Sequence, residues 1–220
     1  MTLQTTIDMV LVLTLLLDLG ILAVSRLVTG VRLFAFQSLL LASLPLLGAA
    51  LSGEEFSLHA PLIAISTIAL KVVLIPYILV RLIRTGEIHA EITPLIGFTA
   101  SVFVGAVLIA ASFAVATRLP LPLPSMSHMV VPAALSTLMI GLLVLISRVK
   151  AITQVLGFLL VENGIFTFGL TLLKSMPVLV ELGILLDVFV GVFIMAIVVY
   201  HIRREFDHMD TDALADAESH

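Results

Sequence analysis

Residues 151–173 read AITQVLGFLLVENGIFTFGLTLL. The run is long and apolar enough to cross a bilayer as a helix, which takes roughly 20 mostly apolar residues. It shows no alternation of apolar and polar residues, so the pattern does not indicate a transmembrane strand. Glu162 lies near its middle, where a short carboxylate reaches neither membrane surface easily. Residues 151–173 therefore predict a membrane-spanning helix with a polar site inside it.

Similar runs lie along the rest of the chain, at 5–25, 35–52, 58–80, 95–117, 129–147 and 177–201. The chain is 60% hydrophobic and 12% charged, with a mean hydropathy of +1.24, whereas a soluble domain carries about 25% charged residues. The first run holds Asp8 where a signal peptide would hold Lys or Arg, so we interpret it as a spanning helix. We expect an all-α integral membrane protein with about seven transmembrane helices.

Basic residues gather in loops that lie on one side of the membrane if there are seven spans. The loops after the first, third, fifth and seventh runs hold Arg26, Arg32, Arg81, Arg84, Arg148, Lys150, Arg203 and Arg204. The opposite loops hold only Arg118 and Lys174. Because Lys and Arg are enriched in cytoplasmic loops, we expect the N-terminus outside and the C-terminus inside. The expected location is the cytoplasmic membrane of a bacterial or archaeal cell.

The chain divides into four segments by composition. Residues 1–118 hold the first four predicted helices, 119–127 form a proline-rich external linker, 128–204 hold three helices, and 205–220 form an acidic cytoplasmic tail. Alternating prolines favour an extended linker. Ser25-Arg26 and Ser147-Arg148 each open a basic loop followed by two helices that end at arginines. This is consistent with a parallel repeat of three-helix units, although unrelated helix–loop–helix units can look alike.

Four charged residues stand out inside the predicted spans, namely Glu162, Asp187, Lys71 and Asp18, whereas Asp8 and Glu181 lie closer to the outer interface. A charge at this depth costs several kcal/mol on most scales and is kept where it has a partner or a task. Glycines four residues before and after Asp187 favour a close helix contact there. Lys71 has three candidate partners, Glu162, Asp187 or a neighbouring subunit. We favour proton relay for the two mid-membrane carboxylates. Lys71 fits relay or a static ion pair equally, and Asp18, as a secondary relay candidate, suits helix packing better.

Residues 157–165, GFLLVENGI, resemble the second helix of the K subunit of respiratory complex I and of the C subunit of Mrp-type cation/proton antiporters. The stretch around Asp187 resembles the third helix of that subunit. The chain length and the extra N-terminal helices resemble hydrogenase-4 component E, the K-like membrane subunit of group 4 nickel–iron hydrogenase and formate hydrogenlyase complexes. The K-like module covers roughly residues 128–212.

The resemblance implies that Glu162 and Asp187 are the two intramembrane carboxylates of a proton pathway. The second acid is Asp where the K family usually has Glu, so its partner must come closer or use water. The K family offers no counterpart for Lys71. In the first proposed repeat, Lys71 falls roughly where Asp187 falls in the second, which suggests a contact between Lys71 and a carboxylate.

We therefore expect a non-catalytic membrane subunit of a complex I-like, hydrogenase-4-type oxidoreductase that relays protons. Its expected partners are antiporter-like membrane subunits and a redox module, either nickel–iron hydrogenase-like or quinone-reactive. We expect no cofactor and no metal in this chain, which has no cysteine, and no nucleic-acid partner. An independent secondary transporter and a structural assembly subunit remain as alternatives.

Overall fold

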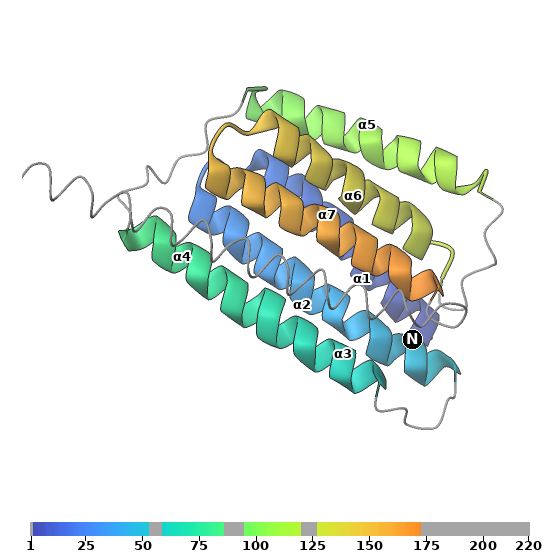
Figure 1. The fold of residues 1–220 in the computed structure, drawn as a ribbon. Helices are drawn as coiled ribbons and strands as arrows, with labels where there is room; N and C mark the ends of the chain where they lie inside the picture. The colour runs from blue at the N-terminus through green and yellow to red at the C-terminus, as the bar shows by residue number, and fades with distance from the viewer. Residues whose placement is uncertain (1, 53–58, 86–94, 120–126, 173–220) are drawn as a thin grey trace, which may run out of the picture.

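The computed structural model describes residues 2–52, 59–85, 95–119 and 127–172, and shows helices lying side by side in a bundle (Figure 1). The helices are α1 (Leu3–Ala23), α2 (Leu27–Ser52), α3 (His59–Thr67), the π-helical segment η1 (Ile68–Leu74), α4 (Ile75–Thr85), α5 (Phe98–Ala116), α6 (Val130–Ser147) and α7 (Ala151–Leu172). The segments α3, η1 and α4 run on as one span. Within the described residues, six helices are long and apolar enough to cross a membrane.

These six spans confirm six of the seven predicted runs, while the seventh, at 177–201, lies outside the described residues together with Asp187. The predicted boundaries were wrong at two places. Helix α2 begins at Leu27, and α4 continues to Thr85, so Arg32, Arg81 and Arg84 lie on helices instead of in loops. Long basic side chains at helix ends reach the membrane surface while their stems cover apolar atoms, so the helices continue through these arginines.

The apolar side chains form two clusters inside the bundle. The first packs around Phe34, Leu79 and Leu156 near the end where α1 joins α2, and the second packs around Ile7 and Leu44 toward the opposite end. Many other apolar side chains are exposed, as the surface of a lipid-embedded bundle requires. In α5, only 17% of the membrane-spanning stretch is buried. The polar side chains described below lie among the buried residues of these helices.

Helices α6 and α7 form a tight antiparallel hairpin in which the two backbones almost touch. A methyl group placed on Gly141 would lie 2.5 Å from the Val161 backbone nitrogen, and one on Gly164 would lie 2.6 Å from that of Leu138. Gly157 is equally close to Leu145. Small residues at such contacts allow the close helix approach that stabilises membrane bundles. The hairpin therefore holds the middle of α7, where Glu162 lies, at a fixed position against α6.

The π-helical segment Ile68–Leu74 ends two residues before Pro76 in the third span. Proline has no backbone N–H and its ring clashes with the carbonyl four residues earlier. The chain widens here into π turns: the Ile75 N–H donates to the Leu70 carbonyl, five residues back. Because π segments change which way the side chains of a helix point, this irregularity sets the direction of Lys71, which is buried.

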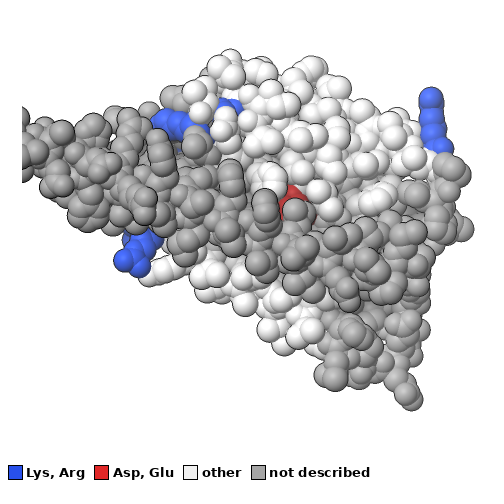
Figure 2. Space-filling model, in the orientation of Figure 1, with Lys and Arg blue, Asp and Glu red and all other residues white. Residues whose placement is uncertain are grey.

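Basic side chains lie mainly at one end of the bundle. The turn between α1 and α2, the end of α4 and the turn between α6 and α7 all meet there (Figure 1, left). Figure 2 shows blue side chains gathered at that end, with another at the opposite end. The described part of the chain thus brings Arg26, Arg81, Arg84, Arg148 and Lys150 to the same end, as the sequence predicts, and Arg118 follows α5 at the other end.

Candidate functional site

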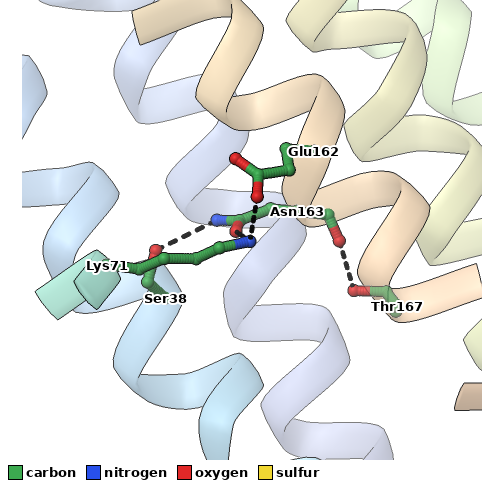
Figure 3. Close-up of polar contacts among 5 residues, drawn as sticks. All are labelled: Ser38, Lys71, Glu162, Asn163 and Thr167. Carbon is green, nitrogen blue, oxygen red and sulfur yellow. Dashed lines mark hydrogen bonds and ion pairs between the residues drawn. The ribbon is translucent and has the colours of Figure 1, made fainter. Parts of the chain in front are cut away.

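The third span and α7 meet through a buried ion pair (Figure 3). Lys71 Nζ lies 3.2 Å from Glu162 Oε1, and the two side chains are only 1% and 3% exposed. The contact has ion-pair distance without hydrogen-bond geometry at Oε1, and no described residue donates a hydrogen bond to Oε2. A carboxylate buried with spare acceptor capacity is costly. The Lys71 ammonium is the charge that compensates it within the described residues.

Asn163 ties this ion pair to a third helix. Its side-chain Oδ1 accepts a hydrogen bond from Lys71 Nζ at 3.3 Å, and its Nδ2 donates to Ser38 Oγ on α2 at 3.1 Å. The Thr167 hydroxyl donates to the Asn163 backbone carbonyl at 2.8 Å, one helical turn further along α7. All of these side chains are buried. The cluster of Ser38, Lys71, Glu162 and Asn163 therefore joins α2, η1 and α7 at one place (Figure 3), and we call it the lysine–glutamate cluster.

The ring of Phe166 lies beside the same lysine, with Nζ 5.5 Å from its centroid. A cation near an aromatic face gains electrostatic stabilisation, most where water is excluded. Phe166 lies one turn after Glu162 on α7, so both residues approach Lys71 from the same helix. The ammonium group is thus surrounded by a carboxylate, an amide oxygen and an aromatic ring.

A second polar cluster surrounds Asp18, which is 0% exposed. Gln37 Nε2 donates to Asp18 Oδ1, and Thr137 Oγ1 donates to Asp18 Oδ2, each at 2.7 Å. These residues come from α1, α2 and α6, and α1 packs against both of the other two helices. We call these three residues the aspartate cluster.

Helix α2 contributes to both clusters through neighbouring residues. Gln37 contacts Asp18, while Ser38 contacts Asn163. Successive residues of a helix point about 100° apart, so one helix can face two neighbours at the same height. The two polar clusters are therefore adjacent across α2 within an otherwise apolar bundle.

At the basic end, Arg148 is buried, with 2% of its surface exposed, although the sequence predicts a loop residue. Its Nη2 donates to the Leu22 carbonyl at 3.0 Å, and its guanidinium lies 5.1 Å from the centre of the Phe98 ring. The carbonyls at a helix end lack partners within the helix and attract positive charge, so Arg148 completes the end of α1. Burial lowers the pKa of this guanidinium.

The structure brings together two of the predicted site residues, Lys71 and Glu162, and places Asp18 in a neighbouring cluster. Asp187 lies outside the described residues. Sequence reasoning missed Gln37, Ser38 and Thr137, all of which are buried and hydrogen-bonded to the clusters. The signal was present in Gln37-Ser38, two adjacent polar residues within the apolar run of α2, because uncharged polar side chains in membrane helices often bridge to other helices.

Comparisons with known proteins find relatives that match most of the chain. The chain is 32% identical over 187 residues to "Uncharacterized protein Rv0085" of Mycobacterium tuberculosis, which covers 84% of each chain. It is 26% identical over 182 residues, 82% of each chain, to "Hydrogenase-4 component E" of Escherichia coli and of Shigella flexneri. No protein-family model matches the chain, and no solved structure matches it. The chain therefore belongs to the family of this mycobacterial protein and is a distant homologue of hydrogenase-4 component E.

Proposed function

We propose that this chain is a proton-coupling membrane subunit of a hydrogenase-4-type, redox-driven ion-pumping complex. The distant homology to hydrogenase-4 component E spans most of both chains and supports membership of such a complex. The buried pair of Lys71 and Glu162 is the observation that supports proton coupling. The chain itself carries out no redox chemistry in this proposal, and its partner subunits supply the metal centres and any quinone site.

The ion pair is a place inside the membrane where a proton can pass from one group to another. Moving one proton from Lys71 Nζ to Glu162 Oε1 converts the ammonium and carboxylate into a neutral amine and a carboxylic acid. The acid then loses its proton to one side, and the amine takes up another from the other side. Each step conserves protons, and the pair returns to its charged form. Pairs of titratable groups in a membrane interior are typical of such relays.

The neighbours of the pair support both arrangements. Asn163 Oδ1 accepts from Lys71 Nζ and can accept equally from a neutral amine, which still carries N–H groups. Glu162 Oε2 accepts no hydrogen bond from the residues that the structure describes, so it can accept one from a proton donor. We propose that Asp187, in the predicted seventh helix, is the second carboxylate of the pathway, following the resemblance to the K-like module.

The basic end of the bundle faces the cytoplasm, and the C-terminus lies on that side, as the distribution of Lys and Arg favours. The partners are antiporter-like membrane subunits and a redox module, nickel–iron hydrogenase-like or quinone-reactive. The membrane is the cytoplasmic membrane of a bacterium or archaeon.

The decisive experiment measures proton translocation in vesicles that contain the assembled complex. Glu162→Gln keeps the size of the side chain and removes its charge, and Asp8→Asn is the matched control, because Asp8 lies near the opposite end from the arginines and is half-buried. We expect Glu162→Gln to abolish pumping while the complex assembles, and Asp8→Asn to pump as the parent does. If Glu162→Gln impairs assembly, Glu162→Asp retains the charge and should slow pumping.

A static role for the pair makes a different prediction. The pair joins η1 to α7 and, through Asn163, to α2. Its role could therefore be purely structural, to hold these helices together. In that case an assembled Glu162→Gln complex would pump at the parental rate, and the proton-coupling proposal would be wrong.

Membership of the complex has its own test. Membranes dissolved in mild detergent are bound through a tag at the C-terminus, and the proteins that are recovered are identified. Recovery of antiporter-like subunits with a redox module supports the proposal. Recovery of this chain alone, monodisperse and folded, would instead favour an independent secondary transporter.

A further inference from the structure

Asp18 is the most completely buried charged residue among those described, at 0% exposed. It lies within α1 and accepts hydrogen bonds from Gln37 on α2 and Thr137 on α6. Both donors are neutral. The carboxyl group is therefore hydrogen-bonded at each oxygen but, within the described residues, has no cation beside it, which distinguishes it from Glu162.

The helices packed against α1 carry almost no charge that would compensate Asp18. Helices α5 and α6 contain no Asp, Glu, Lys, Arg or His within their bounds, and α2 contains only Arg32, which is exposed near the basic end. On α1 itself the other charged residue is Asp8, nearer the opposite end. The nearest described cluster holds Lys71, which already pairs with Glu162. An ionised carboxylate buried without a counter-charge is strongly disfavoured and is neutralised by a proton instead.

The hydrogen-bond partners of Asp18 suit a carboxyl group that gains and loses a proton. The Gln37 amide has a donor and an acceptor at equivalent positions, and the Thr137 hydroxyl both donates and accepts. With Asp18 ionised, Gln37 Nε2 donates to Oδ1, and the Gln37 Oε1 atom is buried without a donor among the described residues. Half a turn of the amide brings Oε1 to Asp18, where it accepts from a protonated carboxyl group.

We propose that Asp18 is a proton-binding site, held in both its charged and its neutral form by Gln37 and Thr137. On uptake, a hydrated proton gives its proton to Asp18 Oδ1, the Gln37 amide turns, and the new O–H group donates to Gln37 Oε1. On release, the O–H bond breaks, the proton leaves as a hydrated proton, and the amide turns back so that Nε2 donates again. No other reactant is consumed. A lysine at the place of Gln37 would fix the charged form, because an ammonium only donates.

The position of Gln37 connects this site to the lysine–glutamate cluster. The next residue, Ser38, accepts a hydrogen bond from Asn163, which in turn accepts from Lys71. A change of charge at Asp18 alters the electrostatic potential at the lysine–glutamate cluster on the other side of α2, because the interior of the bundle screens charges poorly. Gain of a proton at Asp18 removes a negative charge near Lys71. It therefore favours the form of the pair in which Lys71 is a neutral amine. This coupling rests on the proposed function, whereas proton binding at Asp18 does not.

Infrared difference spectroscopy of the assembled complex, between acidic and alkaline conditions, tests the site without an activity readout. A protonated carboxyl group has a C=O stretching band that an ionised one lacks. We expect the parent to show such a band from Asp18, Asp18→Asn to lose it, and Asp8→Asn to keep it. Gln37→Met should shift the same band, because it removes the acceptor while Asp18 stays in place. This second variant keeps the test valid if Asp18→Asn does not assemble.

Two results would overturn the proposal. One is an unchanged carboxyl band in Asp18→Asn and Gln37→Met, which would show that Asp18 stays in one protonation state. The other is a band that responds to sodium at constant pH, which would make the aspartate cluster a cation site. If the carboxyl band is unchanged in Asp18→Asn and Gln37→Met and the Glu162→Gln complex does not pump, the inference about Asp18 is wrong and the proposed function stands. Loss of the band in Asp18→Asn with normal pumping by Glu162→Gln would remove the proposed function alone.

Discussion

Lys71 Nζ lies 3.2 Å from Glu162 Oε1, inside the membrane-spanning bundle and almost wholly shielded from its surroundings. Lys71 belongs to a π-helical turn of the third span, and Glu162 belongs to the middle of α7. Removing one partner of a buried pair leaves the other charge uncompensated, which costs about 3–5 kcal/mol, whereas replacing both partners by neutral groups costs much less.

The double replacement of this pair should therefore be milder than either single one. We expect Lys71→Met and Glu162→Gln each to lower the thermal stability of the detergent-solubilised protein, and the double variant to recover most of the loss. The measurement is a double-mutant cycle of unfolding midpoints. Arg118→Met, at an exposed arginine, is the control for loss of a positive charge. Strictly additive losses would show that the two charges do not interact.

Ser38→Ala should weaken the connection between α2 and α7. The substitution removes the oxygen that accepts from Asn163 Nδ2, and an unsatisfied buried donor costs about 1–3 kcal/mol. Ser43→Ala on the same helix is a matched control, because the Ser43 hydroxyl donates only to the Leu40 carbonyl within its own helix. The measurement is the unfolding midpoint of each variant. Equal effects of the two substitutions would contradict the proposed connection.

Gly164→Ala should destabilise the α6–α7 hairpin although alanine is the better helix former. The added methyl group would lie 2.6 Å from the Leu138 backbone nitrogen, and backbone cannot move aside as a side chain can. Overpacking of this kind costs about 1–3 kcal/mol. The methyl group of Gly169→Ala meets nothing within 4 Å among the described residues, and the substitution should be neutral or slightly stabilising, by about 0.5–1 kcal/mol. The opposite order of unfolding midpoints would show that the helices are further apart.

Arg148→Lys should destabilise the basic end more than Arg26→Lys does. A lysine amine lacks the planar guanidinium that donates to the Leu22 carbonyl while lying over Phe98, and the two side chains are not interchangeable at such places. Arg26 is exposed and serves as the control. We expect a loss of about 1–2 kcal/mol for Arg148→Lys, in line with a charged hydrogen bond, and little change for Arg26→Lys.

The predicted orientation is open to a direct test because the chain has no cysteine. Arg26 and Arg118 are exposed at opposite ends of the bundle. We expect a membrane-impermeant thiol reagent to label Arg118→Cys in intact cells and Arg26→Cys only in inverted vesicles. The reverse pattern would place the basic end outside and contradict the assignment from basic residues.

The spans themselves were predictable because a segment that crosses a bilayer must be long and apolar and must form its backbone hydrogen bonds internally. Long apolar runs are visible directly in the sequence. Residues 151–173 show this well, since α7 occupies almost the whole predicted run. Ends were less predictable. Arg32 and Arg81 lie on helices because their long side chains can reach outward while the helix continues. The residue types alone do not show whether a helix ends before such an arginine or continues past it.

Sequence by itself determined that Glu162, Lys71 and Asp18 lie in membrane-spanning helices, because a charge within an apolar run is evident from the letters alone. Only the tertiary structure decided their partners. Lys71 turns toward Glu162 through the π segment before Pro76, Ser38 reaches Asn163 from a helix far away in the chain, and Gln37 stands beside Asp18. Contacts between helices depend on how glycines such as Gly141 and Gly164 let backbones approach, and that packing is a property of the whole bundle and not of any one helix.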